Sequence, residues 1–128
     1  MILQRLEPQF SVCKLASIQG IASWDADFVF LCKTDEELSL ICESDMLPAD
    51  VLAVEEGYRG MRLQGELDFA LIGVLAKVSS ALAEVGISLL AVSTYNTDYF
   101  FVKERVFDRA AEIVAAVVRD LDGVVQKG

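Results

Sequence analysis

The clearest folding signal in the chain is one apolar helical face followed by two short apolar runs. Residues 71–102 read LIGVLAKVSSALAEVGISLLAVSTYNTDYFFV. Apolar residues recur at helical spacing from Leu71 to Val85, while Lys77 and Glu84 lie off that face. Gly86 is a typical stop signal for such a helix. The apolar face comprises Leu71, Val74, Leu75, Val78, Leu82 and Val85.

A hairpin and a second helix are predicted after this helix. Ile87–Thr94 and Tyr99–Val102 are apolar runs of strand length, and Tyr95–Asp98 between them supplies a polar turn. Val106–Leu121 then repeats the helical spacing. Val124-Val125 predicts a short final strand, which would give a split βαββαβ unit.

Short strands are also predicted before the first helix. Two of them, Phe28–Lys33 and Leu38–Cys42, flank the acidic turn Thr34–Glu37 and predict another hairpin. Ser44–Gly57 contains Pro48 and several acids, which favours a short helical turn and a connector. The remaining predicted strands are Phe10–Ala16 and Tyr58–Gln64.

The two halves of the chain resemble each other weakly. An offset of 61 residues pairs Phe28–Cys32 with Leu89–Ser93, and Glu37–Glu43 with Asp98–Glu104. In the first copy, Ser17–Asp27 leaves room for little more than a turn. We therefore predict an α+β, ferredoxin-like chain of two units, an abbreviated unit at 1–57 and a complete unit at 58–128.

Composition excludes several classes of function. The 128 residues include 20 acidic and 11 basic residues, so a formal charge of −9 disfavours binding to nucleic acid or anionic lipid. Histidine is absent, which removes the commonest general base and metal ligand, and no metal or cofactor is expected. No apolar run reaches the roughly 18 residues of a membrane span, and Met1–Phe10 lacks the pattern of a signal peptide. Cys13, Cys32 and Cys42 lie in apolar runs and are expected as buried free thiols of a soluble cytoplasmic protein.

One stretch carries a resemblance to a known family. Leu67–Gly73, LDFALIG, is followed by Ile87–Tyr99, ISLLAVSTYNTDY, and together they resemble the amino-acid-binding ACT domain. More narrowly, the chain resembles ACT-domain proteins related to the CASTOR-type arginine sensors, as two tandem ACT-like units. The resemblance implies a βαββαβ fold, side-by-side pairing of units through their sheets, and an amino acid held where two units meet. It also implies a homodimer or higher oligomer.

The resemblance assigns candidate ligand-binding residues by position. Ser88 and Leu89 would contact the main-chain groups of the ligand, and the hairpin would contact a ligand from a neighbouring unit. Backbone N–H groups at the start of the helix would suit a carboxylate. The candidates are Asp68, Phe69, Gly73, Ser88, Leu89, Thr94, Tyr95, Asn96, Thr97 and Asp98.

Ordinary structural roles remain open for the same residues. Asp68 is also a helix cap, and Gly73 would allow a close approach of helix and sheet. Ser88 would bond to main chain at a strand edge, and Thr94, Asn96 and Thr97 are common hairpin residues.

The leading hypothesis is a regulatory amino-acid sensor that reports to a separate effector protein and is not itself an enzyme. One alternative is a structural oligomerisation unit whose pocket is filled by side chains such as Phe69 and Tyr95. Another is a small enzyme subunit that uses Asp68 and Asp98 as a carboxylate pair.

Overall fold

The computed structural model describes residues 2–21, 25–64 and 73–127, and the chain divides into two compact units. Unit 1 comprises Met1–Glu7 and Arg59–Gly128, and unit 2 comprises Pro8–Tyr58. Unit 2 is therefore an insertion within the sequence of unit 1. The predicted division into 1–57 and 58–128 differs in two respects, because the first seven residues group with the later unit and Tyr58 with the earlier one.

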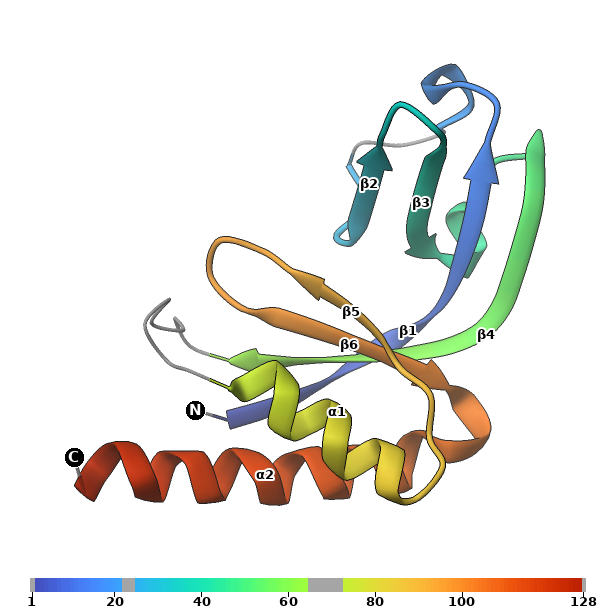
Figure 1. Ribbon diagram of the computed structural model, residues 1–128. Helices are drawn as coiled ribbons and strands as arrows, with labels where there is room; N and C mark the ends of the chain where they lie inside the picture. The colour runs from blue at the N-terminus through green and yellow to red at the C-terminus, as the bar shows by residue number, and fades with distance from the viewer. Residues whose placement is uncertain (1, 22–24, 65–72, 128) are drawn as a thin grey trace. The chain divides into compact units, whose positions relative to one another are not determined.

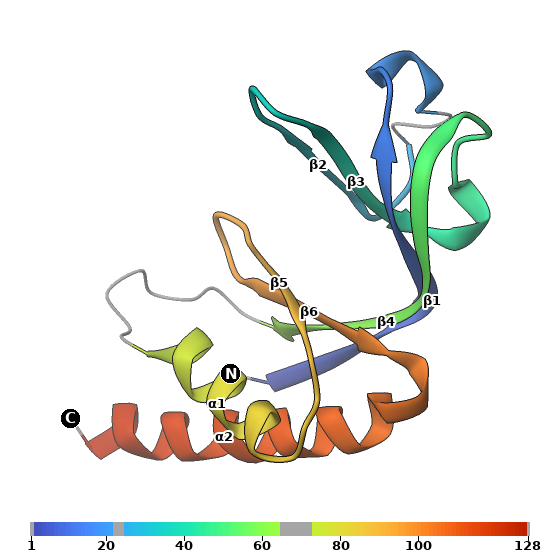
Figure 2. The ribbon, with the colours of Figure 1, turned by 45° about the vertical axis from the view of Figure 1, so that its right-hand side comes forward.

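Unit 1 is an antiparallel sheet with two helices on one face (Figures 1 and 2). The strand order in this unit is β1-β4-β6-β5. The strands that contribute are β1 (Ile2–Leu15), β4 (Val51–Gln64), β5 (Leu90–Ser93) and β6 (Asp98–Lys103). The helical segments are α1 (Val74–Glu84), the 3-10 turn η3 (Glu104–Val106) and α2 (Phe107–Lys127). The arrangement agrees with the predicted ferredoxin-like α+β class.

The fourth strand of the sheet in unit 1 is not the segment that the sequence predicted. The predicted final strand Val124-Val125 is wrong, because α2 continues to Lys127. The start of β1 takes the fourth place in the sheet, next to β4. A closing strand at the end of the chain is then unnecessary.

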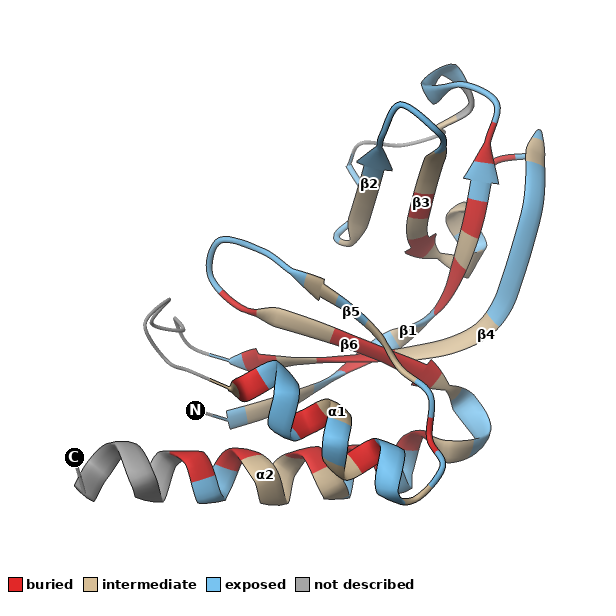
Figure 3. Ribbon diagram, viewed as in Figure 1, coloured by how far each residue is buried: buried red, intermediate tan, exposed pale blue. Residues whose placement is uncertain are grey.

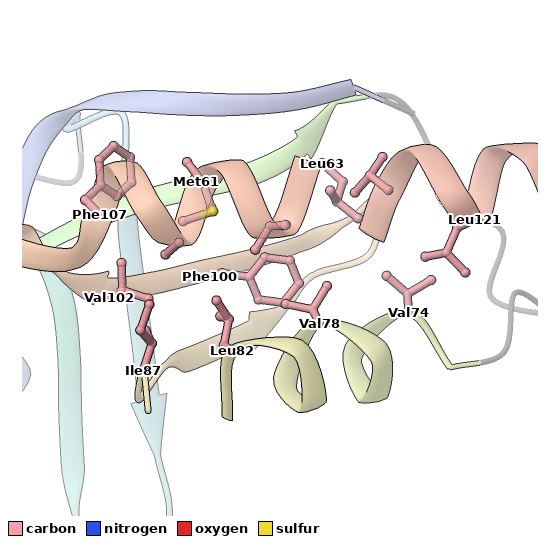
Figure 4. Close-up of a cluster of buried hydrophobic side chains, with 14 residues drawn as sticks. Met61, Leu63, Val74, Val78, Leu82, Ile87, Phe100, Val102, Phe107 and Leu121 are labelled. Atoms are coloured by element: carbon pink, nitrogen blue, oxygen red, sulfur yellow. The ribbon is translucent and has the colours of Figure 1, made fainter. Parts of the chain in front are cut away.

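The core of unit 1 lies between its sheet and its two helices. Figure 4 shows the Phe100 ring pointing from β6 towards Val78 and Leu82 of α1, while Met61 and Leu63 of β4 lie towards α2. All five side chains are fully buried. Alternation along β4 and β6 places these residues on the helix face.

Both ends of α1 depend on glycine. Gly86 has φ of +75° and its N–H donates to the carbonyl of Ala83, while the N–H of Ile87 donates to the carbonyl of Leu82. This is a Schellman-type end and confirms the predicted stop. Gly73 precedes the helix with φ of +86°, and a Cβ there would meet no atom of the described residues within 4 Å. Its backbone conformation therefore requires glycine, and our reading of a close approach between helix and sheet is wrong.

Unit 2 has its own smaller core. Its strand order is β2-β3-β1-β4, and the predicted hairpin is confirmed as β2 (Val29–Lys33) with β3 (Leu38–Glu43). The described part of this unit has only two helical segments, the 3-10 turns η1 (Ile18–Gly20) and η2 (Ser44–Met46). Figure 3 shows a buried stripe along each helix of unit 1, and in unit 2 buried residues mainly on β1 and β3. The fully buried hydrophobic cluster of unit 2 is Cys13, Leu15, Leu40 and Cys42.

Two strands are much longer than predicted. β1 begins at Ile2 and not at Phe10, and β4 begins at Val51 within the predicted connector Ser44–Gly57. The connector prediction is correct as far as Asp50 and wrong from Val51 onward, where strand-forming valines outweigh the acids. Gly57 adopts φ of +83° inside β4, a conformation that permits a bulge there.

Two segments of the first half correspond to segments of the second half, at a separation one residue shorter than the predicted offset of 61. β3 and η2 correspond to β6 and η3 at a constant separation of 60 residues, one fewer than predicted. The two hairpins close alike, since the N–H of Thr34 donates to the Glu37 carbonyl and that of Thr94 to the Thr97 carbonyl, each at 2.9 Å. In each hairpin the turn fixes the register of the two strands. The predicted offset came instead from aligning continuous apolar runs, and such runs still match when one is shifted by a single residue.

The core of unit 1 makes a direct prediction about α1. Leu82 is fully buried, and Leu75 on the same helix is 41% exposed. Leu82→Ala should lower the free energy of unfolding by about 2–5 kcal/mol, because it leaves a cavity, and Leu75→Ala by less than about 1 kcal/mol. Urea unfolding followed by circular dichroism measures both. Equal losses in the two variants would contradict the packing of α1 described here.

Candidate functional site

The hairpin between β5 and β6 is built by Thr94 and Thr97. The Thr94 hydroxyl donates to the Thr97 carbonyl at 2.9 Å and accepts the Thr97 N–H at 3.3 Å. The buried Thr97 hydroxyl donates to the carbonyl of Leu63 at 2.7 Å, which attaches the turn to β4. Both threonines therefore have a structural role in this turn, whatever else they contact.

The other predicted residues of the hairpin lie outward. Tyr95 is 79% exposed at the tip, so the described structure does not use it to fill a pocket. Asp98 accepts a hydrogen bond from the hydroxyl of Ser93 at 2.8 Å across the hairpin. The sequence did not predict Ser93 as a ligand-binding residue. Ser93 lies opposite Asp98 in the ladder between β5 and β6, and this pairing brings the two side chains together.

Ser88 and Leu89 lie at the opposite end of β5 from the hairpin. Ser88 is exposed, while Leu89 is half-buried and packs against the core of unit 1. Gly73 lies before α1 in the left-handed conformation given above. Asp68 and Phe69 lie outside the described residues, as does Trp24 in unit 2.

An open hollow of about 450 Å³ lies beside the hairpin. It brings together three predicted residues, Thr94, Asn96 and Thr97, with side chains from β1, β4 and β6. The lining residues that the sequence did not predict are Gln4, Arg62, Leu63, Gln64 and Tyr99. The volume suits a small metabolite.

Arg62 is the central polar group of this hollow. Its Nε donates to Gln4 Oε1 at 2.9 Å, and its Nη1 donates to the Tyr99 hydroxyl oxygen at 3.1 Å. The guanidinium also lies 5.8 Å from the centre of the Tyr99 ring. Strands β1 and β6 thus hold an arginine of β4 in one orientation. In the sequence, Arg62 stands between Met61 and Leu63, where an arginine is typical of the polar face of a strand.

Across the described ranges, no three side chains of the histidine, cysteine or acidic types are grouped to hold a metal ion. The proposed carboxylate pair cannot be placed, because Asp68 is outside those ranges. No described helix combines the length and apolarity needed to cross a membrane.

Two of the three thiols form a buried pair in unit 2. The pKa of Cys42 is raised to about 11, mainly by burial and to a smaller extent by the nearby Cys13 and Glu43. Burial also raises the pKa of Cys13. The prediction of buried free thiols is confirmed for these two residues and wrong for Cys32, which is exposed because strand alternation turns it away from Leu31 and Val29.

The ACT domain family model matches residues 53–116, half of the chain. The chain belongs to the ACT domain family. The matched segment includes α1, β5, β6 and the hairpin between β5 and β6 that lies beside the hollow. A second model, which describes an N-terminal domain, matches residues 8–50 of this ACT-domain chain.

Solved structures resemble this ACT-domain chain over nearly its full length. Protein Atu0741 from Agobacterium tumefaciens is 30% identical, with 90% of this chain and 87% of that chain covered and a TM-score of 0.76. The aspartokinase alpha and beta subunits are 14% identical, with 93% and 98% covered and a TM-score of 0.66. The regulatory subunit of aspartate kinase from Thermus thermophilus, in its ligand-free form, is 10% identical, with 91% and 97% covered and a TM-score of 0.66. At these low identities the two kinase likenesses show the fold alone, and no curated protein sequence matches the chain.

The different environments of the thiols predict their reactivity. Only Cys32 should react with a chromogenic disulfide reagent at pH 8 in the folded protein, because thiolates react and burial keeps Cys13 and Cys42 protonated. Absorbance should report one thiol per chain, rising to three in guanidinium. Cys32→Ser should abolish the native reaction. Equal reactivity of all three thiols in the folded protein would show that the pair is accessible.

Proposed function

We propose that this ACT-domain protein is a regulatory module that binds an amino acid and is not itself an enzyme. Membership of the family supports the proposal, as does the likeness in fold to a regulatory subunit of aspartate kinase. The buried unoxidised thiol pair of unit 2 is compatible with a cytoplasmic location, where thiols stay reduced.

One observation carries the proposal: β5 is the outer strand of the sheet in unit 1. Its residues alternate between half-buried and exposed, and its far side offers backbone groups to another strand. Ser88 and Leu89 lie at one end of this edge, and the hairpin Thr94–Thr97 lies at the other.

Two-fold pairing of such edges would unite the two sets of candidate residues. An antiparallel contact between β5 strands of two copies places the Ser88 end of one copy beside the hairpin of the other. Neither set could form this pocket within one unit, because the whole of β5 separates them. The proposed ligand therefore lies at the interface of a homodimer, where Ser88 and Leu89 meet its main-chain groups and Thr94, Tyr95 and Asp98 meet it from the partner copy.

The tandem nature of the chain is part of the proposal. The correspondence of β3 and η2 with β6 and η3 supports an origin of unit 2 as an abbreviated ACT-like unit. A relationship to CASTOR-type sensors would make arginine one ligand to test. The assembly would act on a separate effector protein, with a coupling free energy of about 1–3 kcal/mol between ligand and effector.

The edge pairing can be tested by one charged substitution. Ala91 is exposed on β5, and Ala91→Lys should convert a dimer to a monomer because two lysines would face each other across the two-fold axis. Ala76→Lys, at an exposed position of α1, is the matched control and should leave the dimer intact. Light scattering after gel filtration measures both masses. A wild-type monomer, or a dimer that survives in Ala91→Lys, would remove β5 as the interface.

Ligand binding can be tested by a thermal-shift screen of the wild-type protein against the twenty amino acids. A ligand at about 100 times its Kd should add roughly 2.7 kcal/mol of stability, so one or a few amino acids should raise the Tm. The same ligand should have little effect on monomeric Ala91→Lys. If no amino acid raises the Tm of a confirmed dimer, the chain is a structural oligomerisation unit instead.

A further inference from the structure

We propose that one edge of unit 2 docks an extended, basic segment of a partner protein, which adds a strand to the sheet. The edge is formed by Val51–Val54 at the start of β4, and we call it the β4 edge. It lies entirely within unit 2. The inference needs neither an amino-acid ligand nor pairing of β5, so it stands apart from the proposed function.

The backbone of the β4 edge has a neighbour on one side only, among the described strands. In unit 2, β4 is the last strand of the order β2-β3-β1-β4. β6 lies beside the other end of β4, since Thr97 donates to the Leu63 carbonyl and Arg62 donates to the Tyr99 hydroxyl. With six residues, β6 cannot extend along all fourteen residues of β4. The outer N–H and C=O groups of the β4 edge can therefore pair with an added strand.

The β4 edge exposes apolar side chains as well as backbone. Leu52 is 61% exposed and Val54 is 40% exposed. The two residues share one face of the strand, because side chains alternate along it. Figure 3 shows the half of β4 that belongs to unit 2 as mostly exposed, whereas Val51 packs against the core of that unit. An added strand would cover both exposed side chains, which supply the specificity in this mode of recognition.

The other outer strand of unit 2 offers less to a basic partner. β2 ends in Lys33, and BUR-class exposure of a large hydrophobic side chain is absent from its described residues Val29–Lys33. Val29 and Leu31 pack against the core of unit 2 instead. The β4 edge therefore combines two features that β2 lacks, exposed large apolar side chains and a stretch without a basic residue.

Charge decides which occupant suits the β4 edge. Unit 2 contains ten acidic and two basic residues. Unit 1, with ten acidic and nine basic residues, has no positive excess that could neutralise it. A second copy of the chain would place another acidic unit 2 at this edge, and like charges oppose association. A segment that alternates basic and apolar residues is attracted instead, with its apolar side chains over Leu52 and Val54.

Nuclear magnetic resonance of the full-length protein tests the β4 edge directly. The probe is a synthetic octapeptide of alternating valine and lysine with blocked ends. It should shift the backbone amides of Leu52, Ala53 and Val54, and the shifts should saturate and should weaken as salt is added. An octapeptide of alternating valine and glutamate should produce no such shifts. The measurement uses the wild-type protein, so it does not depend on whether any variant folds.

Matched lysine substitutions separate docking at the β4 edge from general attraction between charges. Leu52→Lys should weaken binding of the basic peptide by about tenfold or more, because an apolar contact is lost and a like charge is introduced. Leu75→Lys makes the same change at an exposed leucine of α1 in unit 1 and should leave the affinity almost unchanged. Ala91→Lys should also bind the peptide as the wild-type protein does, whatever its oligomeric state.

Several results would overturn the inference. These are larger shifts on β2 or β5 than on the β4 edge, equal weakening in Leu52→Lys and Leu75→Lys, equal binding of the acidic peptide, or no binding of the basic peptide at low salt. Dissociation of a wild-type assembly by Leu52→Lys would assign the edge to a second copy of the chain. Failure here would leave the amino-acid screen and the β5 edge untouched, and failure of either would leave the peptide result untouched.

Discussion

The sheet of unit 1 depends on the start of β1, which the inserted unit 2 separates in sequence from the rest of unit 1. The first residues of β1 lie against β4, and side chains there also reach the start of α2. Arg5 pairs with Asp108 at 2.9 Å, and Arg59 donates to the carbonyl of Leu6 at 3.0 Å. The guanidiniums of Arg5 and Arg59 lie 5.8 and 4.5 Å from the centre of the Phe107 ring. The exposed ion pair contributes little by itself, but the cation–π contacts and the strand pairing anchor the amino-terminal strand.

This placement of β1 also positions the hollow. Gln4 is two residues before Leu6 on the same face of β1, and it holds Arg62 of the neighbouring strand. If the amino-terminal strand were replaced by a strand from the end of the chain, the partner of Arg62 Nε would change with it. The topology of unit 1 and the polar network on its open sheet face are thus parts of one arrangement.

How far the sequence could predict this molecule depended on how local each signal was. The hairpins, both long helices and the Gly86 stop were predictable because short-range periodicity and turn residues determine them. The origin of the fourth strand was not, since nothing in Ile2–Glu7 indicates a partner about fifty residues later.

The residues of the candidate site also differ in how local their sequence signals are. Thr94, Asn96 and Thr97 are close in sequence, and the resemblance to a family placed them at a site. Arg62, Gln4 and Tyr99 come from three separate strands, and only the folded sheet brings them together. Exposure of Cys32 depended on which face of β2 was covered, and this too is a property of tertiary structure.

The insertion of unit 2 within unit 1 has a consequence for the order of events during synthesis. Residues 8–58 form a contiguous unit whose internal partners are all present once this segment leaves the ribosome, but Ile2–Glu7 must wait for β4 and for the α2 residues near Asp108. At about 5–20 residues per second, that wait is roughly 5–20 s. For this time the nascent chain exposes a strand without its partner, which is a template for aggregation. Arg5, Glu7 and Pro8 are gatekeeper residues of the kind that suppress such pairing, so the same short segment both completes the fold and protects the unfinished chain.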